Sequence, residues 1–326
     1  MHAIVLESHG DPEVLRLREV PDPVIGPEDV LVDVVSTAVN RADVLQRLGL
    51  YPAPGRAPAF EIPGLEFAGR VAAIGDRVAA WQPGDAVMGI VSGGGYASRV
   101  AVHERQVMRV PDEVPLRDAG SIPEVWITAY DALVAQCGLR SGDTVLVHAG
   151  ASGVGTAAIQ IAKALGATVF VTTSPNKLAR CLALGADVAI DHTTDDFVAS
   201  CRDRTGGRGV DVVLDVIGGD YLDRNVDAMA PRGRLVQVGT MGSAKATLNL
   251  GKVMSKRITI VGTVLRARPL DEKIAITQRF AHELLPGFAR GVLRSVIDTR
   301  FALADAPAAH TLVESNATFG KVLLEV

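Results

Sequence analysis

Hydrophobic positions along the 326-residue chain follow two different patterns. In residues 1–122, short valine-rich runs such as VLVDVVSTAV and DAVMGIV are separated by Pro and Gly, which is typical of strands joined by turns. In residues 123–262, nearly continuous apolar runs such as TVLVH and TVFVT alternate with segments of helical periodicity. Such runs indicate strands of a parallel sheet that helices cover on both faces. The pattern predicts a mainly β domain followed by a doubly wound α/β domain.

The last section, residues 263–326, returns to mixed character. Its spacing predicts one amphipathic helix around residues 271–290 and a terminal strand, GKVLLEV. We expect this section to pack back onto the first domain. Residues 1–122 and 263–326 would then form one domain, and residues 123–262 the other.

Composition and charge exclude several classes of protein. The net charge is −4 and the Lys and Arg residues are scattered, which argues against a nucleic-acid-binding protein. No uninterrupted apolar run approaches the roughly 20 residues of a membrane span. The start, MHAIVLESHG, lacks the features of a signal peptide, and the three cysteines are widely separated. We therefore expect a cytoplasmic protein with reduced thiols.

The glycine-rich turn GASGVG, residues 150–155, lies between a predicted strand and a predicted helix. Gly150 would allow the turn, Gly153 and Gly155 would let helix and strand approach, and the first helical N–H groups, including that of Val154, would face a pyrophosphate. Ser152 replaces the second glycine of the usual dinucleotide motif. Its hydroxyl either donates to a phosphate oxygen or merely tolerates the turn. Because residue 154 is Val rather than Gly, the turn does not match the serine-hydrolase pattern.

The end of the second predicted strand indicates which dinucleotide binds. An NAD site has an acidic residue there for the adenosine ribose hydroxyls, and TVFVT is followed by none. Thr173, Ser174 and Lys177 stand there instead, and His192 follows the next strand. These side chains are suited to a 2′-phosphate, although Lys177 alone is also compatible with a solvated helix position. The pattern predicts NADPH rather than NADH.

Six segments in the same order resemble a known family. They are NRADVLQRLGLYP, IPGLEFAGRV, SIPEVWITAYDAL, HAGASGVGTAAIQIA, DVIGG and GRLVQVGTMG. The chain resembles the quinone oxidoreductase branch of the medium-chain dehydrogenase/reductase superfamily, and is most similar to its tumour-suppressor-inducible subgroup. The resemblance implies a GroES-like, mainly β catalytic domain, a Rossmann-type cofactor domain, a cleft between them and a homodimer. The edge strand near KRITIVG is a candidate for the dimer contact.

The same superfamily has a zinc-dependent branch, so a metal site has to be considered. Where that branch carries a cysteine ligand, this chain resembles it but has Asn40. Where that branch has Gly-His-Glu, this chain has Gly64, Leu65 and Glu66. A catalytic zinc needs three protein ligands of Cys, His or carboxylate type. We therefore expect no metal.

The resemblance also implies roles for particular residues. Tyr51 would donate a hydrogen bond to a substrate oxygen, or else pack within its loop. Asn40 and Asp43 would make hydrogen bonds near the nicotinamide ribose and the substrate, or else form a capped turn. Trp126 is expected in the core, and His148 is expected to make a local hydrogen bond without a catalytic role. The further expected cofactor contacts are Thr128, Gly239, Thr240, Met241, Val264, Leu265 and Arg266.

Without a Lewis acid, hydride is expected to pass from NADPH to an acceptor that is already electron-poor. An NADPH-dependent quinone oxidoreductase is the favoured interpretation. A reductase of activated alkenes, either enones or enoyl thioesters, is the first alternative. A non-enzymatic NADPH-binding sensor or scaffold is the second.

Overall fold

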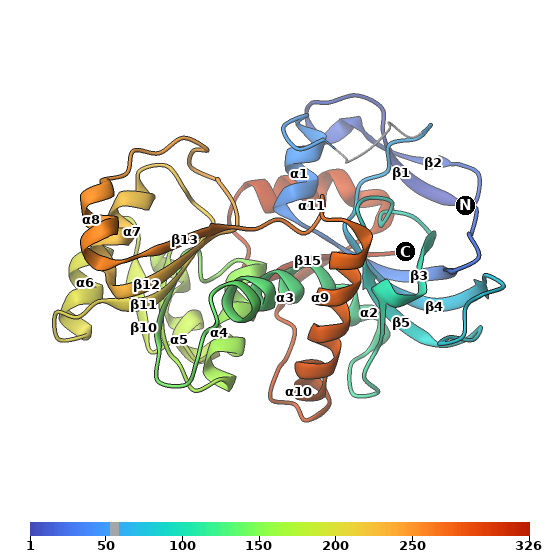
Figure 1. The fold of residues 1–326 in the computed structure, drawn as a ribbon. Coiled ribbons are helices and arrows are strands. Elements are labelled where there is room, and N and C mark those ends of the chain that lie inside the picture. Colours follow the sequence, from blue (N-terminus) through green and yellow to red (C-terminus); the bar gives the residue numbers. More distant parts are fainter. Residues whose placement is uncertain (53–58) are drawn as a thin grey trace. The chain divides into compact units, whose positions relative to one another are not determined.

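The computed structural model describes residues 1–52 and 59–326 and divides them into two compact units (Figure 1). The first unit is Met1–Ile127 with Leu265–Val326, and the second is Thr128–Val264. The division lies inside helix α3 (Pro123–Tyr130), slightly later than the boundary expected from composition. Trp126 explains the difference, because its buried ring packs edge-on against Phe288 of the first unit. Trp126 is therefore a core residue, as expected.

The first unit is built on a seven-stranded sheet. Its strand order is β14-β15-β3-β4-β5-β7, and β6 also pairs with β3. Strands β1 and β2 form a separate antiparallel pair. The bounds are β1 (His2–Leu6), β2 (Leu15–Glu19), β3 (Asp29–Val39), β4 (Glu66–Ile74), β5 (Ala86–Ile90), β6 (Arg99–His103), β7 (Val107–Arg109), β14 (Ile297–Ala302) and β15 (Lys321–Glu325).

Alternation along β3 creates one of the apolar cores of this unit. Val30, Val32 and Val34 point to the same face and pack with Phe67 of β4 and Val87 of β5. From Ser36 to Val39, β3 is buried on both faces, where β15 pairs with it and the C-terminal helix packs against it. The predicted valine-rich strands are therefore present.

The C-terminal section packs onto the first domain, as expected. Strand β15 pairs antiparallel with β3 in a register that places Val322 opposite Val39. The single helix expected around residues 271–290 is wrong, because the segment forms two helices that meet at Leu284. Pro286 explains the break, since proline has no N–H group to continue a helix. The helices of the unit are α1 (Arg41–Arg47), α2 (Leu116–Ala119), the start of α3, α9 (Leu270–Glu283), α10 (Leu285–Ala289) and α11 (Ala306–Glu314), with short 3-10 turns η1 (Pro12–Val14), η2 (Glu104–Gln106) and η5 (Leu303–Asp305).

The second unit is a six-stranded, wholly parallel sheet of order β10-β9-β8-β11-β12-β13. Successive strands move outward in one direction from β8 and in the other from β11, which is the doubly wound arrangement predicted from the sequence. Its strands are β8 (Thr144–Val147), β9 (Thr168–Thr173), β10 (Val188–Asp191), β11 (Val210–Asp215), β12 (Met229–Gln237) and β13 (Thr259–Gly262).

Helices flank this sheet in two groups (Figure 1). Helices α4 and α5 pack together, as do α6, α7 and α8. Right-handed crossovers place the two groups on opposite faces, because the strand order reverses between β8 and β11. The bounds are α4 (Gly153–Ala164), α5 (Leu178–Leu184), α6 (Phe197–Arg204), α7 (Tyr221–Ala228), α8 (Leu250–Lys256), the π-helical turn η3 (Asp131–Gln136) and the 3-10 turn η4 (Pro175–Lys177).

Local signals explain most helix ends in this unit. Gly185 ends α5 with a φ of 120°, and Pro175 occupies the first turn after β9. Ser174 lies at the N-cap of that turn, but its side chain makes no capping hydrogen bond. Cys137, Cys181 and Cys201 are buried free thiols. Within residues 1–52 and 59–326, no helix has both the length and the apolar character needed to cross a membrane.

Candidate functional site

The glycine-rich turn connects β8 to α4. The turn lies close both to β9 and to the first turn of α4. Gly150 donates its N–H to Thr172 O of β9, and a Cβ at residue 150 would lie 2.6 Å from the Cβ of Val171. The left-handed conformation of the turn falls on Ala149, whose φ is 54°. The need for glycine at 150 therefore comes from packing against β9, and not from the backbone turn as the sequence suggested.

Gly155 lets the first turn of α4 lie directly on the loop. A Cβ at residue 155 would lie 2.4 Å from Ala149 O, closer than any side chain tolerates. Ser152 is the N-cap, because its Oγ accepts the Gly155 N–H at 3.0 Å. In the described residues, the N–H groups of Gly153 and Val154 have no acceptor. Two unpaired N–H groups at the positive end of a helix form a site suited to phosphate.

The hydroxyl of Ser152 therefore caps α4, a role that the sequence analysis did not assign to it. A hydroxyl group accepts with its lone pairs and donates with its one hydrogen. Because Ser152 Oγ accepts from Gly155, its own hydrogen stays available for a phosphate oxygen. The expected contact with phosphate remains a prediction.

A buried polar network lies beneath this loop. His148 Nδ1 is 2.9 Å from Thr172 Oγ1, and His148 Nε2 is 2.7 Å from Asn225 Oδ1. Asn225 Nδ2 donates to Asp215 Oδ2 at 2.9 Å, and Asp215 Oδ1 accepts two backbone N–H groups from the loop after β11. Burial lowers the pKa of His148. His148 is hydrogen-bonded as expected, but its partners are distant in the chain rather than local, and the network joins the ends of β8, β9 and β11 to α7.

The residues predicted to select NADPH lie at the ends of β9 and β10. Thr173 and Lys177 are buried, Ser174 is partly exposed, and His192 is exposed. His192 donates its N–H to Thr173 O at 3.1 Å, so the ends of these neighbouring strands lie side by side. The structure thus brings three hydroxyl or imidazole groups and one ammonium to one edge of the sheet.

An acidic residue that the sequence analysis did not weigh lies at this edge. Asp191 ends β10 opposite Thr173. Its Oδ1 accepts both the N–H and the hydroxyl of Thr193, and these bonds lower the pKa of the carboxyl. The carboxylate is therefore held by the loop that follows it. The end of β9 itself carries no acid, as the sequence indicated.

The other expected cofactor contacts fall in both units. Gly239, Thr240 and Met241 follow β12, and Met241 donates its N–H to Val216 O of the loop after β11. Thr128 is buried in α3, and Val264 ends the second unit with an exposed side chain. The remaining two, Leu265 and Arg266, belong to the first unit.

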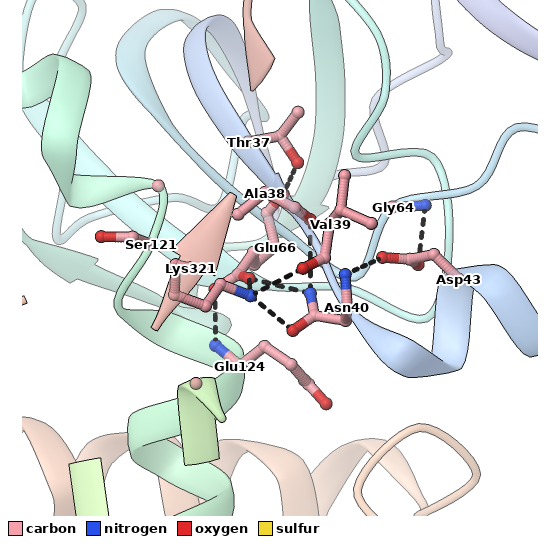
Figure 2. Close-up of polar contacts among 12 residues, drawn as sticks. Thr37, Ala38, Val39, Asn40, Asp43, Gly64, Glu66, Ser121, Glu124 and Lys321 are labelled. Atoms are coloured by element: carbon pink, nitrogen blue, oxygen red, sulfur yellow. Dashed lines mark hydrogen bonds and ion pairs between the residues drawn. The ribbon is translucent and has the colours of Figure 1, made fainter. Parts of the chain in front are cut away.

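In the first unit, a buried ion pair organises the residues around Asn40 (Figure 2). Lys321 Nζ donates to Glu66 Oε1 at 2.8 Å and to Asn40 Oδ1 at 2.6 Å. Asn40 Nδ2 donates to the same Glu66 oxygen at 2.8 Å. Glu66 Oε2 accepts the backbone N–H of Glu124 at 2.8 Å. These contacts tie β15, β4 and the starts of α1 and α3 together.

Lys321 and Glu124 were not singled out from the sequence. The signal for Lys321 was present as a charge directly before the apolar run VLL in the strand KVLLEV. A lysine in such a strand needs a buried acceptor, because an unpaired buried charge is strongly unfavourable. Nothing in the sequence indicated that Glu66, far away in the chain, is that acceptor.

Asp43 is fully buried, and its hydrogen-bond partners all belong to the first unit. Its Oδ2 accepts the Asn40 N–H at 2.8 Å and the Tyr96 hydroxyl at 3.2 Å, and its Oδ1 accepts the Gly64 N–H at 3.2 Å. The Tyr96 oxygen is also 3.1 Å from His310 Nε2. Burial raises the pKa of Asp43 to about 6. Both carboxylate oxygens are occupied by these donors, which matches the capped-turn interpretation. The expected contact of Asn40 and Asp43 with ligand remains a prediction.

Tyr51 follows α1 and lies under a buried arginine. The guanidinium carbon of Arg266 is 5.2 Å from the centre of the Tyr51 ring, and Arg266 Nη1 donates to Tyr51 O. Arg266 also donates to Ser92 O and to Gln46 Oε1, so its guanidinium joins three segments of the first unit. Burial raises the pKa of the Tyr51 phenol. The rest of the expected Tyr51 loop, residues 53–58, lies outside the described residues.

Comparison with known proteins identifies the family. Residues 26–112 match the profile described as alcohol dehydrogenase GroES-like domain, and residues 153–280 match that described as zinc-binding dehydrogenase. A quinone oxidoreductase of Pseudomonas aeruginosa is 34% identical over 327 residues, which cover 98% of each chain. The chain belongs to the quinone oxidoreductase branch of the medium-chain dehydrogenase/reductase superfamily.

Solved structures of this superfamily match along the whole length. The structure of Escherichia coli quinone oxidoreductase complexed with NADPH matches with a TM-score of 0.90 and 29% identity, covering 100% of both chains. The CurK enoyl reductase matches with a TM-score of 0.87 and 28% identity, covering 99% of this chain and 98% of that one. The predicted combination of a GroES-like domain and a Rossmann-type sheet is confirmed.

A catalytic zinc needs three protein ligands of Cys, His or carboxylate type. Asn40 and Glu66 offer oxygen atoms, and Leu65 offers no ligand. The Lys321 ammonium already lies between the two oxygens, at 2.6 and 2.8 Å, where it would repel a dication. Among residues 1–52 and 59–326, no three His, Cys, Asp or Glu side chains are grouped as metal ligands. The residues at this position of the quinone oxidoreductase chain do not fit zinc.

The buried pair predicts a large effect of Lys321 on stability. Lys321→Met leaves the Glu66 carboxylate buried without a cation, so the first unit should lose about 3–5 kcal/mol. Denaturant unfolding followed by tryptophan fluorescence measures this, because both tryptophans, Trp81 and Trp126, lie in that unit. Adding Glu66→Gln to Lys321→Met should restore part of the loss.

A matched control separates burial from pairing. Arg18 pairs with Glu7 on the exposed β1–β2 surface, and removing an exposed pair changes stability by under about 1 kcal/mol. A Lys321→Met protein that is no less stable than Arg18→Met would contradict the importance of the buried pair.

Proposed function

We propose that the protein is an NADPH-dependent, zinc-independent quinone oxidoreductase. The observation that carries this proposal is the phosphate loop of the second unit, in a chain whose full length matches quinone oxidoreductases. When bound, NADPH supplies a hydride from its nicotinamide ring. An acceptor that needs no Lewis acid, such as a quinone, suits a site at which the Lys321 ammonium is already paired with Glu66.

The second unit would bind and orient the cofactor. The N–H groups of Gly153 and Val154 would hold the pyrophosphate, with the Ser152 hydroxyl beside them. Lys177 and His192, at the ends of β9 and β10, would hold the 2′-phosphate. The network around His148 would keep the loop rigid, so that little ordering is needed on binding.

The first unit would act as the catalytic domain. Tyr51 would direct its phenol toward a substrate oxygen, since its backbone and ring are both held by Arg266. Asn40 and Asp43 would act near the substrate by positioning α1, because Tyr51 comes shortly after this helix in the chain. We place the boundaries of this domain where the compact unit has them, at Ile127 and Leu265.

A reductase of activated alkenes is the second candidate function. The CurK enoyl reductase has the same fold along nearly its whole length, which favours this candidate over a non-enzymatic role. An enoyl-thioester carrier would bring phosphate groups, for which a basic rim is needed. The sequence shows scattered rather than clustered Lys and Arg residues.

An acceptor panel tests the proposed function. NADPH oxidation is followed at 340 nm with ortho- and para-quinones, with enones and with enoyl thioesters. Quinones should give kcat/KM values at least about tenfold above those of the alkenes, because the site has no metal-type electrophile. Turnover of alkenes alone would replace this function with the second candidate. Cofactor binding without turnover of any acceptor would leave the sensor or scaffold.

Lys177 tests the choice of cofactor. Lys177→Met should weaken NADPH binding about 10- to 100-fold, since a hydrogen bond to a charged group contributes about 1.5–3 kcal/mol. NADH binding should hardly change, because NADH has no 2′-phosphate. The dissociation constants are measured by nicotinamide fluorescence. Lys163→Met is the matched control, because Lys163 is paired with Asp187 on the exposed face of α4. An equal loss for both cofactors would contradict the assignment of Lys177.

We also propose a homodimer formed through β13. This strand lies at the end of its sheet and pairs only with β12 within the described residues. Exposed apolar side chains surround it, including Ile260 on the strand and Leu250 and Met254 on α8. An open, apolar strand edge is suited to pairing with a second copy across a twofold axis.

Charge at this edge should separate the two copies. A chain carrying Ile260→Lys and Met254→Lys should elute with half the mass of the wild type in light scattering, because paired lysines across the axis repel. Val24→Lys is the control, since Val24 is 92% exposed but lies in the first unit. A double variant that keeps the wild-type mass would exclude β13 as the contact.

A further inference from the structure

Several ionisable side chains of the first unit gather around the first turn of α3. Glu124 lies in that turn, and the charged groups that act on it are Glu66 of β4, Lys321 of β15, Asp43 of α1 and Arg266. Tyr51 belongs to the same cluster, because the charge of Glu124 also affects its phenol. The cluster thus combines residues from both ends of the chain.

Most members of this cluster are already engaged. Both oxygens of Asp43 accept hydrogen bonds, and both oxygens of Glu66 do so as well. The Lys321 ammonium has three oxygen acceptors, two of them being side chains. Each nitrogen of the Arg266 guanidinium donates within the unit. These groups are therefore all engaged in holding the structure of the first unit.

Glu124 and Tyr51 differ from the others. Within the described residues, neither the Glu124 carboxyl nor the Tyr51 hydroxyl has a hydrogen-bond partner. Only the backbone N–H of Glu124 is bonded, to Glu66, and Figure 2 shows the side chain extending away from Glu66 and Lys321. The side chain is partly exposed, so it can exchange a proton with water. A carboxyl that is anchored by its backbone but unpaired at its tip is suited to act on a ligand.

We propose that the Glu124 carboxyl is the proton donor in quinone reduction, an inference that rests on the function proposed above. A quinone becomes a hydroquinone by taking up two electrons and two protons. The hydride brings both electrons and one proton. The second proton passes from the Glu124 carboxyl to the negatively charged quinone oxygen: the carboxyl O–H bond breaks and the hydroquinone O–H bond forms. The resulting carboxylate takes a proton back from water.

The acidity of the two unpaired groups favours Glu124 over Tyr51 as the donor. Burial, together with the negative charges of Glu66 and Asp43, raises the pKa of Glu124 to about 8. The carboxyl is therefore protonated at neutral pH. Its pKa also lies close to neutral pH, and a general acid is most effective when its pKa is near the pH at which it works. Burial raises the pKa of Tyr51 above its ordinary value of 10.0, which makes the phenol a poorer source of a proton. Tyr51 would then orient the quinone by a hydrogen bond while Glu124 supplies the proton.

The pH dependence of Glu124→Gln tests this proposal. In the wild type, kcat/KM for a quinone should fall as the pH rises through about 8, because the carboxyl that donates the proton is lost there. Glu124→Gln keeps the backbone N–H that bonds Glu66 but has no acidic proton. It should lower kcat/KM at pH 7 by about 10²- to 10⁴-fold and remove the fall near pH 8. Glu124→Asp should keep the fall at a reduced rate.

Controls separate catalysis from folding and from the proposed function. NADPH affinity and the thermal midpoint of Glu124→Gln should match the wild type, and Glu113→Gln, an exposed glutamate of the same unit, should leave the pH profile unchanged. Tyr51→Phe should lower the rate but keep the fall near pH 8. A Glu124→Gln enzyme that keeps this fall, or a Tyr51→Phe enzyme that loses it, overturns the proposal while leaving the quinone reductase intact. A wild type that reduces no quinone overturns both.

Discussion

The ion pair between Lys321 and Glu66 connects the last strand of the chain to a strand that lies some 250 residues earlier. Both side chains are buried, so each charge has lost its hydration and depends on the other. Such a pair is stable only if the remaining donors and acceptors are also satisfied. Asn40 meets this condition, because its amide oxygen accepts from Lys321 and its amide nitrogen donates to Glu66. The pair therefore determines where Asn40, and with it the start of α1, must lie.

The second oxygen of Glu66 extends this constraint to α3. It accepts the N–H of Glu124, so a single carboxylate sets the starts of both α1 and α3. Tyr51 follows α1, and Glu124 belongs to α3. The Glu66 carboxylate therefore helps to position both of the side chains whose polar ends are unpaired. In the second unit, Asp215, Asn225 and His148 play a comparable part for the loops at the carboxyl edge of the sheet. In each unit a buried polar network, rather than the apolar core, aligns the segments nearest the expected ligands.

A feature of this protein can be predicted from the sequence when the residues that cause it lie close together in the chain. The strands of the parallel sheet were predictable, because each is a local apolar run, and the phosphate loop was predictable from six consecutive residues. The break at Leu284 was missed although Pro286 signals it, since the apolar periodicity continues across the proline. The role of Gly150 was misjudged because Val171, which excludes a side chain there, belongs to the next strand. Glu124 and Lys321 escaped notice for the same reason: their partners are distant in the chain, and only the fold brings them together.

The position of Lys321 also bears on the kind of chemistry the site supports. A zinc ion with an open coordination position polarises a bound oxygen directly. The Lys321 ammonium lies between Asn40 and Glu66, and its acceptors are these two side chains and a backbone carbonyl. The positive charge of Lys321 is therefore neutralised inside the protein and does not polarise a substrate oxygen. An acceptor reduced here must already be electron-poor, and the negative charge that develops on its oxygen has to be met by a proton rather than by a cation. A protonated carboxyl beside the buried pair satisfies that requirement, because burial and the negative charges of Glu66 and Asp43 keep Glu124 protonated.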